Sequence, residues 1–232
     1  MKMLEDDILK SENELKLNSK VTELIKSLSL LVNHFNNTYE FEPGLYLYKK
    51  LITKIRKKEI KILLEDDKFI GLLYTTLWSW GMNIRGAKMK DFKSFNEEIK
   101  RNQENFVGLS SYQVIDLTSE QLTKIEPKIK RLYSNLHIMN SNTNITANSK
   151  IMHFILPDLI FPIDSKIRNF IGYYGDDSQG FYDSFLILFK ITQQIHAKVN
   201  LKEFILANKL DISIPKSIDN IITSYNDIIK KK

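Results

Sequence analysis

Apolar residues recur at intervals of three and four along most of this chain, which is the period of an amphipathic α-helix. Val21, Leu24, Ile25 and Leu28 show the spacing near the start. No two runs of alternating residues are separated by a hairpin turn, so we expect no substantial sheet. The chain is therefore predicted to be all-α. The same period predicts about ten helices, over residues 21–35, 44–60, 67–81, 91–103, 119–136, 147–156, 165–171, 180–197, 201–207 and 215–230.

Local signals support several of these helix ends. Thr118 and Gln121 have the spacing of a capping box, and Asp164 directly precedes a helical run. Pro215 lies just inside the last predicted helix, a position that proline favours. These signals fix helix starts independently of the apolar period.

The segment 67–81 is apolar nearly all round, which is typical of a central, buried helix. We expect it to stop at Gly81 and to place Trp78 in the core. The stretch 140–149 is the most polar of the chain and is predicted to be a surface loop.

A chain of 232 residues can bury a substantial core. No internal repeat and no linker interrupts it, so residues 21–232 are predicted to form a single compact domain of about ten helices, which could divide into two helical lobes. Residues 1–20 are rich in charge, and we expect them to dock loosely.

The amino-acid composition excludes several kinds of site. The absence of cysteine excludes disulfides, cysteine–zinc sites and iron–sulfur clusters, and the four histidines are scattered, so we predict no metal site and no cofactor. The chain has no long apolar run, which predicts a soluble, cytoplasmic protein that does not enter a membrane. The net charge of +6 permits a partner such as double-stranded DNA without requiring one.

The segment 147–170, ANSKIMHFILPDLIFPIDSKIRNF, carries the main candidate for chemistry. Asp164 could simply cap the helix that follows it. It also ends an apolar run stiffened by Pro162, and an ionised aspartate in a cleft can activate water or stabilise a developing cation. Both explanations stay open from the sequence.

Lys150 is predicted in the first turn of its helix, where a lysine opposes the helix dipole. It could contact phosphate, or it could act as a nucleophile if its pKa is lowered. The simpler explanation is an exposed lysine in a lysine-rich chain. His153, one turn later, is more readily explained as a core histidine bonded to backbone, although it and Ser149 are also candidate binding residues.

Basic and aromatic residues elsewhere suggest nucleic-acid contacts. Trp80 could line a pocket or stack on a base, with Arg85 and Lys88 nearby in sequence. Lys166 and Arg168 follow Asp164 and are candidates of the same kind. Residues 49–61 hold seven basic residues against one acid; such a run could follow a phosphate backbone, but it is more often a solvated face.

The segments SKIMHFIL and FPIDSKIRNFIG, with LLYTTLWSWGMN upstream, resemble the helix-hairpin-helix DNA glycosylase superfamily. They are also similar to uncharacterised prokaryotic proteins that carry SK-x-x-H-x-x-x-P followed by P-x-D. The glycosylase resemblance implies that Lys150 attacks the sugar carbon and that Asp164 assists departure of the base. This chain has no glycine in the stretch before Lys150 and a short interval from Lys150 to Asp164.

The sequence thus predicts a nucleic-acid-binding protein with a glycosylase-like helical fold, with base-excision activity on damaged DNA through Lys150 and Asp164 if it is an enzyme. The alternative is a non-enzymatic helical domain that binds another protein. In that case Ser149 or Asn148 caps one helix, His153 bonds buried backbone and Asp164 caps the next helix.

Overall fold

The structure, a computed structural model, describes residues 15–39, 42–84, 86–208 and 213–228. Residues 15–26 form a helix that leads into α2. The elements that follow are α2 (Leu28–Tyr39), α3 (Pro43–Ile55), α4 (Ile60–Glu65), α5 (Asp67–Ser79), α6 (Phe92–Arg101), α7 (Gln103–Val107), the 3-10 helix η1 (Val114–Asp116), α8 (Ser119–Asn135), α9 (Asn144–Ile155), α10 (Ser165–Ile171), α11 (Ser178–His196), α12 (Leu201–Ala207) and α13 (Ile214–Ile228).

The prediction of an all-α fold is confirmed. Across the described ranges the only extended pairing is one isolated antiparallel bridge between Met89 and Met139. A single cluster of buried apolar side chains extends from Val21 to Tyr225, so the helices share one core. In these same ranges no helix is both long enough and apolar enough to cross a membrane.

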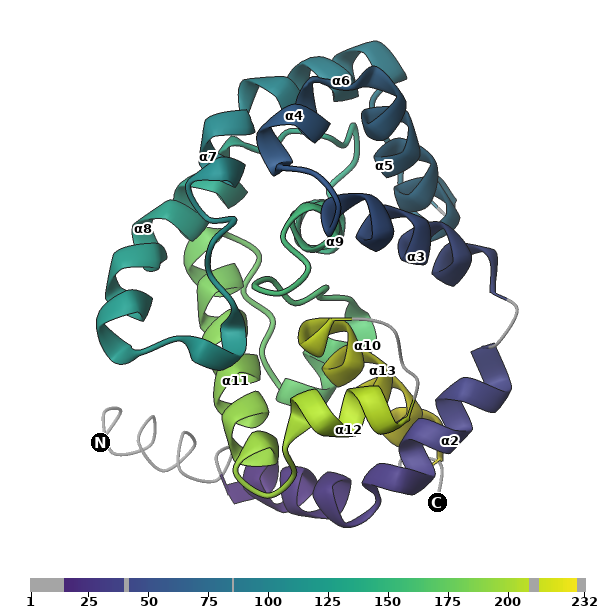
Figure 1. Cartoon of the computed structure of the whole chain (residues 1–232), viewed down its shortest axis with the longest axis vertical. Coiled ribbons are helices and arrows are strands. Elements are labelled where there is room, and N and C mark those ends of the chain that lie inside the picture. Colours follow the sequence, from purple (N-terminus) through teal and green to yellow (C-terminus); the bar gives the residue numbers. More distant parts are fainter. Residues whose placement is uncertain (1–14, 40–41, 85, 209–212, 229–232) are drawn as a thin grey trace.

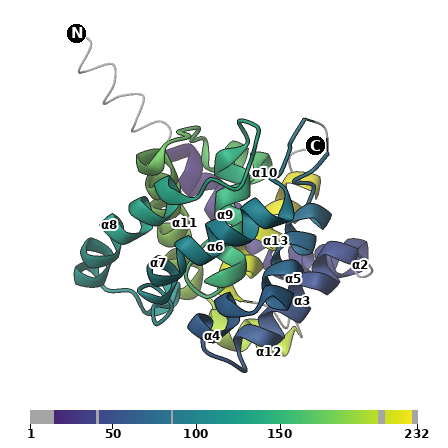
Figure 2. The ribbon, with the colours of Figure 1, turned by 90° about the horizontal axis from the view of Figure 1, so that it is seen from above.

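Helix α9 lies in the middle of the molecule. Both views place it there, and in Figure 1 helices α4 to α7 lie above it while α10, α12, α13 and α2 lie below it (Figures 1 and 2). Every residue of α9 except Asn144 and Thr146 is buried. The central helix is therefore α9.

The prediction that segment 67–81 is the central helix, with Trp78 in the core, is wrong. Helix α5 buries one face through Phe69, Ile70 and Leu73, but 47% of Trp78 is exposed. An aromatic residue on the outer face of an amphipathic helix looks like a core residue in the sequence, because only packing decides which face is covered.

The predicted loop at 140–149 is also wrong in its second half, because α9 begins at Asn144. Lys150 therefore lies in the second turn of its helix, and the argument from an unfavourable first-turn position does not apply to it. A buried polar residue of α9 also joins this helix to the end of α8. The buried Asn148 donates to the carbonyl oxygens of Tyr133 and Leu136 at 3.2 and 2.9 Å, where α8 ends.

The predicted caps are confirmed. Thr118 and Gln121 form a reciprocal capping box at the start of α8, and the Asp164 side chain caps α10. Pro215 is the second residue of α13. Gly81 follows the end of α5 with φ of 84°, a conformation that glycine adopts readily.

Of the segment predicted to dock loosely, residues 1–14 lie outside the described residues. Residues 15–20 belong to the first described helix, and the Lys20 ammonium donates to the carbonyl oxygen of Phe170 at 2.8 Å. That bond reaches the end of α10, where the last carbonyl groups of a helix lack partners within the helix.

Candidate functional site

A cavity of about 230 Å³ opens below α9, where six helices and the segment before α10 meet. Its walls come from parts of the chain that are far apart in sequence, namely α2, the start of α3, the end of α5, α9, α10 and α13. The lining residues are Phe35, Tyr39, Glu42, Leu45, Ser79, Trp80, Lys150, Pro162, Asp164, Lys166, Lys216, Asp219 and Thr223. Four of the residues predicted from the sequence are among them: Trp80, Lys150, Asp164 and Lys166.

Lys150 extends from α9 into this cavity and is only 8% exposed. Its ammonium donates to the carbonyl oxygen of Trp80 at 2.8 Å. That carbonyl belongs to the C-cap of α5, where the helix dipole is negative and attracts a cation. The lysine is therefore a buried cation fixed at one end of a helix, and not the exposed lysine of the simpler explanation.

Burial is the largest influence on the pKa of the Lys150 ammonium and lowers it below the usual value. The neighbouring ammonium of Lys216 lowers the pKa further, whereas Asp164, Asp219 and Glu42 act in the opposite direction. A lysine whose pKa is lowered holds a larger fraction of uncharged amine at neutral pH, and the uncharged amine is the nucleophile.

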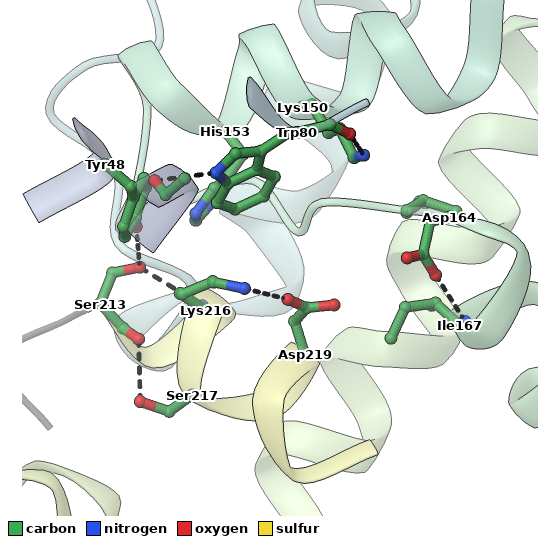
Figure 3. A network of polar contacts seen from close by, with 12 residues as sticks. Tyr48, Trp80, Lys150, His153, Asp164, Ile167, Ser213, Lys216, Ser217 and Asp219 are labelled. Carbon is green, nitrogen blue, oxygen red and sulfur yellow. Dashed lines mark hydrogen bonds and ion pairs between the residues drawn. The ribbon is translucent and has the colours of Figure 1, made fainter. Parts of the chain in front are cut away.

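Asp164 caps α10 and also lines the cavity. One carboxylate oxygen accepts from the backbone N–H of Ile167 at 3.0 Å, and Figure 3 shows the second oxygen directed away from that amide. Capping therefore uses one of its two oxygens. The carboxylate acts on Lys150 through its charge, and no hydrogen bond joins the two side chains in the structure.

A second lysine–aspartate pair, which we did not predict from the sequence, reaches the cavity from α13. Lys216 donates to Asp219 at 2.5 Å, and the two residues are 7% and 8% exposed (Figure 3). Burial raises the pKa of the Asp219 carboxyl, and Asp164 raises it further, while Lys216 and Lys150 lower it. The spacing of three residues was visible in the sequence, but it resembles an ordinary surface pair on a helix.

The ring of Trp80 lies close to the ammonium groups of both lysines. The Lys150 ammonium lies 5.6 Å and the Lys216 ammonium 4.5 Å from the centre of the Trp80 ring. The indole N–H donates to the carbonyl oxygen of Gly44 at 3.0 Å, and Phe154 meets the ring edge-on. A Cβ atom at Gly44 would lie 2.8 Å from the ring, so the start of α3 packs directly on the indole.

Tyr39, Lys166 and Asp227 tie three helices together at the edge of the cavity. The Tyr39 hydroxyl donates to Asp227 at 2.9 Å, and Lys166 donates to the other oxygen of the same carboxylate at 3.1 Å. Because α2, α10 and α13 each supply one member, this cluster joins the three helices to one another below the cavity.

The other predicted site residues that the structure describes do not line this cavity. Ser149 is buried and bonds the backbone of Ile163, and His153 is buried with Nδ1 2.6 Å from the carbonyl oxygen of Ile160. Lys88 is exposed on another loop. Arg168 pairs with Asp176 at 2.7 Å, and Arg85 lies outside the described residues.

These contacts correct one detail of the non-enzymatic alternative. Ser149 and Asn148 do not cap α9, because both lie inside the helix, whose N-cap is Thr143. The expected bond from His153 to backbone is present. Within the described ranges no group of three or more His, Asp or Glu side chains is arranged to hold a metal ion.

No protein-family model matches the sequence, and neither a curated protein nor a solved structure matches the chain. The resemblance to DNA glycosylases therefore stays a prediction from the motif residues, and the geometry of the cavity carries the functional argument.

Proposed function

We propose that the protein binds nucleic acid and acts on a nucleotide held at the Lys150 cavity, with base excision as the reaction. The observation that carries this proposal is a buried lysine of lowered pKa in the same cavity as a carboxylate. Stability alone does not explain such residues, because apolar side chains of similar volume usually serve a core as well as buried charges do.

In this proposal the uncharged Lys150 amine attacks the sugar carbon that carries the base. The bond from that carbon to the base breaks, and its electron pair leaves with the base. The proton that the attacking nitrogen loses is available to the departing base. The free oxygen of Asp164 stabilises the positive charge that develops on the sugar.

The size of the cavity favours a small group over a whole ligand. At about 230 Å³ it lies below the range of roughly 300–1,000 Å³ that is common for complete small-molecule sites. A single base turned out of the duplex fits that description. The Lys216 ammonium lies over the Trp80 ring, so we assign Trp80 the role of holding the two ammonium groups instead of stacking on the base.

The basic segment that follows supports the nucleic-acid part of the proposal. Glu42 and Leu45, at the start of α3, line the cavity, and exposed lysines extend from there along the helix and beyond its end. These lysines are Lys49, Lys50, Lys54, Lys57 and Lys58. A phosphate backbone could follow this row while one nucleotide enters the cavity.

The first test is covalent trapping. A duplex with an abasic site, incubated with the protein and borohydride, should become linked to Lys150, and Lys150→Met should remove the link. Lys166→Met is the matched control, because Lys166 lines the same cavity but pairs with Asp227. Trapping that persists in Lys150→Met would exclude Lys150 as the nucleophile.

The second test is the anisotropy of a labelled duplex containing an abasic-site analogue, measured against plain duplex over a salt series. Tighter binding of the analogue is the expected result, and Lys54→Ala should lower the salt slope by about one. Equal and steeply salt-dependent binding would leave a general DNA-binding module. No binding at low salt would end the nucleic-acid proposal.

A second candidate function, a non-enzymatic helical domain that binds a protein, is favoured by one specific observation. Lys150, Ser149, His153 and Asp164 each have a hydrogen bond to backbone that a structural role would explain. On this alternative, Lys150→Met would destabilise the fold, and the wild-type protein would not be trapped on abasic DNA.

A further inference from the structure

Two buried lysines from different helices share one tryptophan. Lys150 comes from α9 and Lys216 from α13, and both ammonium groups lie within 6 Å of the centre of the Trp80 ring. Figure 3 shows Lys216 extending below the indole toward Asp219, while Lys150 reaches the carbonyl of the same tryptophan. The negative face of an aromatic ring stabilises a nearby cation, most strongly where water is excluded.

The position of Lys216 is fixed. Its ammonium donates to Asp219 at 2.5 Å, and Gly44 and Phe154 pack against the Trp80 ring above it. Two like charges at such a site repel each other more strongly than in water. The Lys216 ammonium therefore opposes a charge on Lys150, whereas Asp219, which pairs with Lys216, favours one.

We propose that Lys216, held in place by Asp219, is a positioning residue that keeps the Lys150 amine in its uncharged, nucleophilic form. This deepens the proposed function and rests on its nucleophile. An adjacent cation is one of the known ways in which proteins activate a lysine.

Charged side chains on several helices influence the pKa of Lys150. Lys216 and Asp219 face it from α13, Asp164 from the start of α10 and Glu42 from the start of α3, and the Trp80 carbonyl accepts from it at the end of α5. Among the side chains that influence its pKa, Lys216 is the cation. Removing the charge of Lys216 should therefore raise the pKa of Lys150, and removing the charge of Asp219 should lower it.

The inference predicts a reaction that needs no nucleic acid. The uncharged Lys150 amine should condense with a small aldehyde: its nitrogen forms a bond to the carbonyl carbon, and the carbonyl oxygen leaves as water with the two N–H hydrogens. Cyanoborohydride then delivers hydride to the imine carbon and leaves a stable secondary amine. A lysine side chain in water has a pKa of about 10.4 and is mostly protonated at neutral pH. Exposed lysines should therefore react more slowly than Lys150.

The experiment uses glycolaldehyde and cyanoborohydride with the full chain, followed by peptide mass spectrometry across a pH series. Lys150 should be labelled ahead of the exposed lysines. Lys216→Met should move the midpoint of Lys150 labelling upward by about one pH unit, and Asp219→Asn should move it downward by a similar amount. Below the midpoint, one pH unit corresponds to a tenfold change in labelling rate.

Thr223→Val is the control for a nonspecific disturbance of the cavity and should leave the midpoint in place, because Thr223 lines the cavity and carries no charge. If Lys216→Met does not fold, Asp219→Asn and the double variant Lys216→Met/Asp219→Asn decide the question, because neither contains an unpaired buried aspartate. An unchanged midpoint in Lys216→Met would overturn the role of Lys216. Where that variant does not fold, equal midpoints in Asp219→Asn and in the double variant would do the same.

The two proposals can fail separately. Preferential labelling of Lys150 without trapping on abasic DNA would keep the activated lysine and end the base-excision proposal. Trapping on abasic DNA at Lys150, with a midpoint that neither variant moves, would keep base excision and remove the role of Lys216.

Discussion

Two cavities lie along α9, and they differ in where their charges sit. The cavity around Lys150 has a volume of about 230 Å³, and three of its charged residues, Lys150, Lys216 and Asp219, are buried. The second cavity, beside the C-terminal end of α9, has a volume of about 490 Å³. Its charged lining residues are Arg56, Lys58, Glu59, Lys61 and Asp158, and the surface of each is exposed. The Asp158 carboxyl among them is partly withdrawn from water, and this burial raises its pKa.

The volume of a cavity alone therefore does not identify the functional site. Water screens exposed charges, so their mutual influence is weak. Charges taken out of water influence one another strongly, which is how proteins prepare a lysine or a carboxylate for reaction. The smaller cavity is the better candidate for this reason.

The largest expected effect tests which cavity is the active one. Asp164→Asn should reduce base release by about 100- to 1,000-fold, because an amide cannot stabilise a cationic sugar as a carboxylate does. Binding to duplex should stay intact, since asparagine caps a helix nearly as well as aspartate. Single-turnover assays and anisotropy measure the two quantities.

The matched variant in the second cavity is Asp158→Asn, which should leave base release unchanged. Full activity in Asp164→Asn, or an Asp164→Asn protein that unfolds, would refute the assignment of Asp164. A loss of activity in Asp158→Asn alone would move the site to the larger cavity.

A second prediction concerns stability. Lys216→Met should lower the free energy of unfolding by about 3–5 kcal/mol, because it leaves Asp219 buried without its partner. Lys61→Met, in the second cavity, should cost less than about 1 kcal/mol, since Lys61 and Glu104 form an exposed pair. Denaturant unfolding measures both.

The double variant Lys216→Met/Asp219→Leu should recover most of the stability that Lys216→Met loses. Equal losses for Lys216→Met and Lys61→Met would show that the charges of the two cavities are buried to a similar degree, and the distinction between them would fall.

The smallest expected effect concerns His153, which lies on α9 between the two cavities. Burial lowers the pKa of His153 to about 3, below its ordinary value of about 6.5. In the unfolded chain the imidazole takes up a proton as the pH falls below about 6.5, whereas in the folded protein it stays neutral. The stability from this group is thus complete above pH 6.5 and is lost between 6.5 and 3, by up to a tenfold change in the unfolding constant per pH unit.

His153→Gln should therefore flatten the dependence of unfolding free energy on pH across this window. His137→Gln is the control and should keep the wild-type slope, because His137 is exposed. A wild-type slope in His153→Gln would show that His153 is not held neutral in the folded protein.

Much of the fold was predictable from the sequence. The helix period gave most of the helices, and the Thr118 box and the Asp164 cap marked their starts correctly. The start of α9 was missed because asparagine and threonine favour loops when they are solvated. Asn148 instead donates from inside the core to carbonyl oxygens at the end of α8, which is possible only because α8 and α9 pack together.

About half of the candidate site was predictable. Lys150 and Asp164 came from one motif, and the structure places both on one cavity. Lys216 and Asp219 gave no signal, because an acid three residues after a lysine is common on exposed helix faces. Only the packing of α13 against α2 and α10 buries them.

Helices and their caps could be predicted because they depend on neighbours within about four residues, and the lysine–aspartate motif is visible as a run of letters. Which helix is central, which lysines are buried and which residues share a cavity depend on how the helices pack. The physical reason is that helical hydrogen bonds and caps are local. Burial instead depends on helices that are distant in the chain. It lowers the pKa of Lys150 and takes the Lys216–Asp219 pair out of water.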